Sequence, residues 1–150
     1  ALGGGAGGFV AGDQAVIDTL VQKSRPQLFS NALPPVLAAG AMAAINLLKD
    51  NPQRVGHLRQ NADYLRNGLR KLGYEVIDSP TAIVPIMIGA TADAIAMAKA
   101  MGELGILITG FGYPVVPEGT ARLRAQVSAI HTRNHLDKAI AAFADLKKDL

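Results

Sequence analysis

Apolar residues recur at alternating intervals of three and four positions between residues 53 and 72, which is the strongest hydrophobic pattern in the chain. The stripe consists of Val55, Leu58, Ala62, Leu65, Leu69 and Leu72. This spacing places every member on one face and predicts an amphipathic helix. Gly73 follows directly and predicts the end of the helix, because glycine is preferred just beyond a helical C-terminus.

Short apolar runs and two more helical stripes fill the rest of the second half. We predict strands at 74–77, 82–88, 106–109 and 121–128. One helix is expected from a Thr91 cap to Leu104, and a last helix from a Thr132 cap. Their expected inward positions are Ile95, Ala98, Met101 and Leu104, then Leu136, Ile140, Phe143, Leu146 and Leu150. This order predicts an α/β protein whose second half is an α+β domain, with helices on one face of a mostly antiparallel sheet.

The first fifty residues predict helices without strands. A short helical face is expected within Asp13–Gln22, ended by Ser24–Pro26, and an irregular link within Gln27–Asn31. An alanine-rich helix then begins at Pro34–Pro35, because proline is tolerated in a first helical turn, and runs to about Lys49. The break at Asn51-Pro52 predicts two domains, 1–50 and 51–150.

Composition supports a folded chain with an aliphatic core. Of the 150 residues, 49% are hydrophobic and only 5% aromatic. The absence of cysteine excludes disulfides, cysteine-based zinc sites and thiol catalysis, and it fits a reducing compartment. The net charge of +3 comes from basic residues spread along the chain, which is more typical of a solvated surface than of a nucleic-acid site.

Neither a membrane span nor a signal peptide is expected. The chain starts without Met or a basic segment, unlike a signal peptide. Residues 26–48 carry no charge, but their clean apolar part, 32–45, is too short to cross a bilayer.

Two arginines on one strand are the main candidates for chemistry. Alternation places Leu123, Ala125 and Val127 on one face of the predicted strand at 121–128. Arg122, Arg124, Gln126 and Ser128 lie on the other face. An arginine fork can grip a carboxylate or phosphate at two points. The preceding loop at 110–119 could wall a pocket. The alternatives are a plain solvent-facing strand and a plain connection.

Other motifs for chemistry are weak. His131 and His135 are four residues apart but have no acidic third ligand nearby, so no metal site is expected. Six of the first twelve residues are glycine, yet no predicted strand precedes them, and no complete nucleotide-binding fingerprint stands in the chain. Such a start indicates either a flexible tail or a chain that begins inside a larger fold.

Several segments together resemble the α-oxoamine synthases, which are pyridoxal 5'-phosphate (PLP) enzymes that condense an amino acid with an acyl-CoA. The resemblance runs through the whole chain in order. Its segments are Ala1-Leu2-Gly3-Gly4, Ser24-Arg25-Pro26-Gln27-Leu28-Phe29-Ser30-Asn31, the run from Gly110 through Pro114-Val115-Val116-Pro117 to Arg124, and Ser128-Ala129-Ile130-His131-Thr132.

The resemblance implies the C-terminal part of an aminotransferase-like, fold type I enzyme. Residues 1–50 would be the tail of the large PLP-binding domain with a connecting helix, and 51–150 the small domain. The lysine that forms the Schiff base in this family sits directly before the Ala-Leu-Gly-Gly stretch, so it is expected just before Ala1. No catalytic residue is therefore expected in this chain.

The resemblance also implies roles for individual residues. Arg124 matches the arginine that binds the amino-acid carboxylate. Phe29 and Ser30 match a segment that reaches the cofactor of the partner subunit, with the serine near the PLP phosphate. This implies a homodimer with shared active sites. We interpret Arg122 as an ion-pair residue and His131 as a cap or core contact.

Within the family the segments most resemble the glycine C-acetyltransferases, also called 2-amino-3-ketobutyrate CoA ligases. These join glycine to acetyl-CoA in the cytoplasm, and their reverse reaction serves threonine breakdown. The alternatives are an 8-amino-7-oxononanoate synthase, which uses alanine and pimeloyl-CoA, a bifunctional relative, and a non-catalytic α/β interaction module if the chain is complete.

Overall fold

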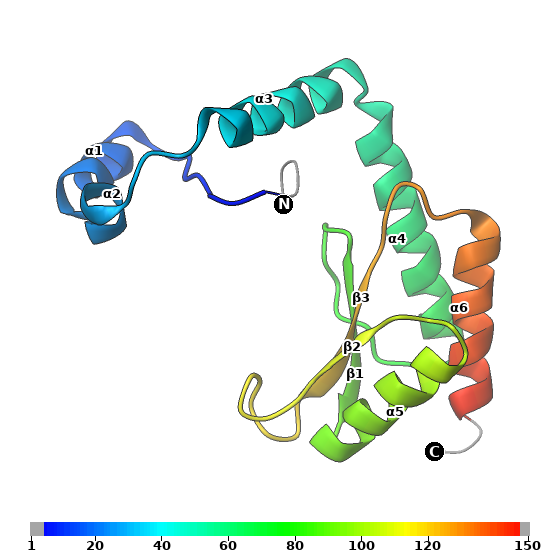
Figure 1. Ribbon diagram of the computed structural model, residues 1–150. Helices are drawn as coiled ribbons and strands as arrows, with labels where there is room; N and C mark the ends of the chain where they lie inside the picture. Colours follow the sequence, from blue (N-terminus) through cyan, green and yellow to red (C-terminus); the bar gives the residue numbers. More distant parts are fainter. Residues whose placement is uncertain (1–4, 148–150) are drawn as a thin grey trace. The chain divides into compact units, whose positions relative to one another are not determined.

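The computed structural model describes residues 5–147, and the chain divides into two compact units (Figure 1). Unit 1 comprises Ala1–Pro52 and unit 2 comprises Gln53–Leu150. The division falls next to the proline break that the sequence shows. The assignment of residues 1–50 to the tail of a larger domain stays a prediction.

Unit 1 contains three helices among its described residues: α1 (Gln14–Lys23), α2 (Arg25–Phe29) and α3 (Pro35–Asp50). The prediction of an irregular link after residue 26 is wrong, because α2 occupies most of it. Pro26 lies in the first turn of α2, where a missing N–H costs nothing. No residue of these helices is buried.

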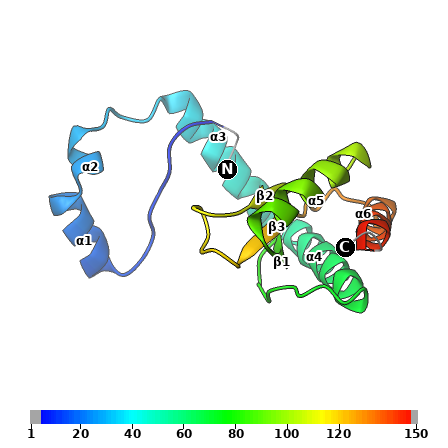
Figure 2. The same cartoon turned by 90° about the horizontal axis from the view of Figure 1, so that it is seen from below.

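Unit 2 packs three helices against a three-stranded antiparallel sheet with the order β1-β3-β2 (Figures 1 and 2). Its elements are α4 (Gln53–Lys71), β1 (Ile83–Gly89), α5 (Thr91–Glu103), β2 (Thr109–Phe111), β3 (Ala121–Gln126) and α6 (Arg133–Leu146). The central strand β3 pairs Arg124 with Pro85 of β1 on one side and with Thr109 of β2 on the other.

Two predicted strands differ from the structure. The strand expected at 74–77 is reduced to a single bridge between Val76 and Ile86. The strand expected at 106–109 lies instead at Thr109–Phe111. The reason is that the chain is still leaving α5 at Ile106, whose N–H donates to the carbonyl of Met101.

The core lies on one face of the sheet, where α4, α5 and α6 cover it. Its largest fully buried side chains are Phe143, Leu69, Ile86, Met101, Leu123 and Val84. The face predicted for α5 is confirmed at Met101, which is buried, and in part at Ala98, which packs half-buried against the core. The prediction is wrong at Ile95 and Leu104, which are 60% and 42% exposed, and Ala94 and Met97 are buried in their place. The stripe predicted for α4 is confirmed at Ala62, Leu65 and Leu69.

The helix ends show which predicted caps form. Thr132 caps α6 in a capping box with His135, as expected. The Thr91 cap is wrong, because Ala90 is the N-cap of α5. Gly73 and Gly105, which follow α4 and α5, have φ angles of 80° and 79°, a backbone conformation that glycine adopts readily. Over residues 5–147, no helix is long and apolar enough to cross a membrane.

Candidate functional site

The face of the sheet opposite the helices carries the candidate site. Leu123 is fully buried on the helix side, while Arg124 is exposed on the other side. The alternation predicted for this strand is therefore confirmed. Over the described part of unit 2, the residues that line the surface beside Arg124 come from β2, β3 and the segment before β2, and none comes from a helix.

Arg124 lines an open depression of about 360 Å³. The other residues around it are Leu107, Ile108, Thr109, Phe111 and Gln126. These residues come from β2, from the segment that leads into it, and from β3. The sequence indicated that the loop at 110–119 could wall a pocket. Phe111 is the one residue of that segment that lines the depression, and it belongs to β2.

The two arginines of β3 have different surroundings. The guanidinium of Arg124 lies 5.7 Å from the ring centroid of Phe111 and makes no ion pair among the described residues. The Arg122 side chain donates from Nε to the carbonyl of Thr120 at 3.1 Å, and from Nη2 to the hydroxyl of Thr120 at 3.3 Å. Among the described residues Arg122 makes no ion pair, and hydrogen bonds to Thr120 hold its side chain, so the ion pair expected for it stays a prediction. Arg124 is left with free donors.

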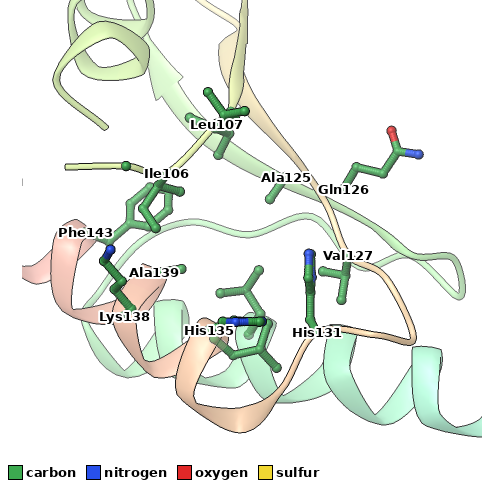
Figure 3. Close-up of a pocket in the computed structure, with 14 residues that line it drawn as sticks. Ile106, Leu107, Ala125, Gln126, Val127, His131, His135, Lys138, Ala139 and Phe143 are labelled. Carbon is green, nitrogen blue, oxygen red and sulfur yellow. The ribbon is translucent and has the colours of Figure 1, made fainter. Parts of the chain in front are cut away.

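A second and larger cavity, of about 430 Å³, lies between α6 and residues 105–108, which lead into β2 (Figure 3). Leu107, Ile108 and Gln126 line both cavities, so the two adjoin. The floor of the larger one is apolar, and Phe143 and Val127 contribute to it.

Two histidines at this cavity accept hydrogen bonds from backbone N–H groups. His131 Nδ1 accepts from the Ser128 N–H at 3.2 Å, and His135 Nδ1 accepts from the Thr132 N–H at 3.3 Å. The carbonyl of His131 also accepts from the amide of Asn61 at 2.8 Å. The interpretation of His131 as a structural contact is confirmed. Within the described residues no group of three or more His, Asp or Glu could hold a metal ion.

Phe29 and Ser30 lie at the C-terminal end of α2 in unit 1. The Phe29 side chain is 78% exposed. The Ser30 N–H donates to the carbonyl of Pro26 at 3.1 Å, so it completes α2 and is not free for a phosphate oxygen. The Ser30 hydroxyl remains exposed and is a suitable donor to an anion.

The groups with shifted pKa values lie away from the depression. A hydrogen bond to Asp137 raises the pKa of Tyr64, and burial raises the pKa of Tyr74. The Arg70 guanidinium lowers the pKa of Asp78 through a hydrogen bond and charge attraction. Of the residues that line the depression, Arg124 is the ionisable one, so the depression offers a permanent cation for binding.

The sequence belongs to the aminotransferase class I and II family, whose model matches residues 2–143. Among its relatives, an 8-amino-7-oxononanoate synthase of Symbiobacterium thermophilum is 39% identical over 96% of this chain. A 2-amino-3-ketobutyrate coenzyme A ligase of Escherichia coli K12 is 37% identical over all of it. A Thermus thermophilus protein that carries both names is 38% identical over 97%.

These relatives are α-oxoamine synthases, and the chain spans only 37–38% of their length. Solved structures agree on the fold. A serine palmitoyltransferase of Sphingomonas wittichii matches 91% of this chain with a TM-score of 0.79 at 25% identity, and this chain covers 35% of it. The chain therefore has the fold type I architecture, as expected, and belongs to a PLP-dependent family.

Two described groups, one in each unit, have side-chain chemistry that suits PLP or its substrate. The Ser30 hydroxyl suits a phosphate oxygen and Arg124 suits a substrate carboxylate. No lysine lines the Arg124 depression. The Schiff-base lysine that the resemblance implies stays a prediction.

The sequence pattern indicated the arginine face but missed Phe111. The third strand was predicted to start three residues too early, and Phe111 was therefore assigned to a loop. As a result, the sequence pattern did not show that Phe111 and Thr109 share the arginine face. A strand shifted to Thr109–Phe111 would have shown it.

Proposed function

We propose that this chain works within a PLP-dependent acyltransferase that condenses glycine with acetyl-CoA to give 2-amino-3-oxobutyrate and CoA. The observation that carries the proposal is the unpaired guanidinium of Arg124 in an open depression lined by β2, β3 and the segment before β2. Both the relatives named as 2-amino-3-ketobutyrate coenzyme A ligases and the sequence around Arg124 support the choice of glycine.

Arg124 binds the carboxylate of the amino acid in this proposal. Glycine has no side chain, so the carboxylate is its main handle for orientation. A two-point, charge-assisted contact fixes which Cα–H bond is positioned for cleavage. PLP, when bound, supplies the electron-withdrawing ring that makes the α-proton acidic. The glycine α-carbon would lose that proton and bond to the acetyl carbon, and the thioester C–S bond would break to release CoA, whose thiolate takes up a proton.

The active site is proposed to be shared between two subunits of a cytoplasmic homodimer. Phe29 and Ser30 would reach the partner's cofactor, with the Ser30 hydroxyl donating to the PLP phosphate. Both residues are exposed in unit 1, so their side chains are accessible to such a contact. In the cell, the reverse reaction would let CoA cleave the keto acid during threonine breakdown.

The test is Arg124→Lys in the holoenzyme, by which we mean the PLP-loaded protein in which this chain operates. Lysine keeps the charge but not the fork. We expect the glycine KM to rise steeply and kcat/KM to fall by about 2–4 kcal/mol, while PLP content stays unchanged. Arg122→Lys is the matched control, and its glycine KM should stay nearly constant because Thr120 holds that side chain. A crippling Arg122→Lys beside a silent Arg124→Lys would mean that the wrong arginine was chosen.

The second candidate is an 8-amino-7-oxononanoate synthase, because relatives at 39% and 42% identity carry that name. Assaying glycine and alanine, each with acetyl-CoA and with pimeloyl-CoA, separates the two. A higher kcat/KM for alanine with pimeloyl-CoA would replace the first candidate with the second.

A further inference from the structure

The contact between Arg124 and Phe111 bears on how the guanidinium group of Arg124 is oriented for binding. An arginine side chain has many rotamers, and holding one of them costs conformational entropy. An ion pair would hold it but would also occupy its donors. An aromatic face holds the flat guanidinium while its N–H edges stay available. Phe111 is the aromatic ring in contact with Arg124.

Phe111 could have paired with the other arginine. In the β2–β3 register it stands directly opposite Arg122, and Arg124 is its diagonal neighbour. Diagonal neighbours in a sheet are still within reach of long and aromatic side chains. Because Thr120 accepts hydrogen bonds from the Arg122 guanidinium, the Phe111 ring is available to contact Arg124.

The position of Phe111 is itself set by tight packing of its neighbours against α5. A Cβ at Gly110 would lie 2.8 Å from the carbonyl oxygen of Ala94. A Cβ at Gly112 would lie 2.3 Å from Cγ2 of Thr91. In addition, the Tyr113 N–H donates to the Thr91 hydroxyl at 3.0 Å.

These contacts hold β2 against the first turns of α5 on one face. Since side chains alternate along a strand, the Phe111 ring must then point to the other face, toward the depression.

We propose that Phe111 is a positioning residue for the carboxylate-binding fork of Arg124. Its ring holds the guanidinium in a single orientation before the amino acid arrives. This role rests on the proposed function of Arg124. It makes Phe111 a determinant of amino-acid binding without direct contact between the ring and the reacting carbon.

The experiment compares Phe111→Leu and Phe111→Tyr in the holoenzyme. Leucine keeps an apolar side chain without the ring, whereas tyrosine keeps the ring. Loss of an exposed cation–π contact predicts a rise of about two- to fivefold in the glycine KM for Phe111→Leu. The kcat should change less than the KM. Phe111→Tyr should restore the KM to near the wild-type value.

Two further variants separate positioning from general stability. Arg124→Gln raises the glycine KM by itself, and adding Phe111→Leu to it should have no further effect, because no guanidinium is left to orient. Tyr64→Leu removes the other arginine–aromatic contact of unit 2, in which Arg133 lies 3.6 Å from the Tyr64 ring centroid. It should leave the glycine KM unchanged even if unit 2 loses stability.

The outcomes separate this inference from the function on which it rests. A normal glycine KM in Arg124→Gln would remove the carboxylate role of Arg124, and with it the role of Phe111. A raised KM in Arg124→Gln beside a normal KM in Phe111→Leu would overturn the positioning role alone. Equal rises in Phe111→Leu and Phe111→Tyr, or an undiminished effect of Phe111→Leu in the Arg124→Gln background, would also overturn it.

Discussion

Helices α3 and α4 show that the two units differ in whether they bury their apolar residues. α3 is almost entirely apolar, with Lys49 and Asp50 as its charged residues, yet it buries no side chain. α4 carries several charges and nevertheless buries Leu65, Leu69 and even Arg66. The composition of a helix therefore does not decide its burial. What decides it is whether a complementary surface is present.

Arg66 is a buried charge in unit 2 that is paired at both terminal nitrogens, while its buried Nε has no hydrogen-bond partner among the described residues. Its side chain is 5% exposed, forms an ion pair with Asp63 at 2.6 Å, and donates to the carbonyl of Ser79 at 2.9 Å. A buried charge is costly unless it is paired and hydrogen-bonded, so this arginine depends on a well-ordered surrounding. Among the described residues of unit 1, no comparable buried group exists.

The largest expected difference between the units is in amide hydrogen exchange of the chain 1–150 by itself. Amides of β3 should exchange only through global unfolding of unit 2, whereas those of α3 should exchange through local opening. A helix of this length without tertiary packing is marginal in water, so the exchange rates should differ by orders of magnitude. Mass spectrometry of deuterated peptides measures this. Equal protection of α3 and β3 would contradict the comparison.

Truncating one phenylalanine in each unit should give very different losses of stability. Phe143 is 1% exposed and meets the Tyr74 ring edge-on at a centroid distance of 5.3 Å. Phe143→Ala should lower the free energy of unfolding by about 3–5 kcal/mol. Phe29→Ala is the matched change in unit 1 and should alter it little, because that ring is already exposed. Urea denaturation followed by circular dichroism compares the two variants.

Two glycine-to-alanine changes within unit 2 should have opposite signs. Gly112→Ala forces a Cβ against Thr91 and should destabilise by about 1–3 kcal/mol. Gly56→Ala lies within α4, where a Cβ meets nothing within 4 Å, and should stabilise by about 0.5–1 kcal/mol. Melting temperatures of both variants report the sign. A stabilising Gly112→Ala would show that β2 and α5 are not closely packed.

A similarly small effect is expected at the cap of α6. Thr132→Ala removes the side-chain oxygen that accepts from the His135 N–H, and should cost about 1 kcal/mol. Thr132→Ser keeps the hydroxyl and should restore most of that loss. Thermal unfolding of the three proteins checks the order, and indistinguishable alanine and serine variants would rule out a stabilising cap.

Much of the local structure could be predicted because local structure depends on near neighbours. The three- and four-residue spacing of Ala62, Leu65 and Leu69 predicted α4, and the position of Thr132 predicted the start of α6. Alternation along β3 placed Arg124 on the open face. Each of these patterns repeats over a few residues, so the sequence carries it directly.

The site needed more than alternation. The alternating pattern places both arginines of β3 on the same face and does not distinguish between them. Only the resemblance to a family singled out Arg124 as the residue that binds a carboxylate. The structure separates them physically, because Arg122 turns to Thr120 while Arg124 lies over Phe111. Neither the ring nor the glycines beside it could be assigned a role without knowing where β2 begins.

By itself, the sequence determined the membership of a family, the described helices other than α2, and the face of β3 that carries Arg124. Only the tertiary structure decided the register of β2, the inward face of α5, and which arginine keeps free donors. The physical reason is that these features depend on contacts between residues far apart in the chain. Thr91 meeting Tyr113 is an example, and no local period encodes it.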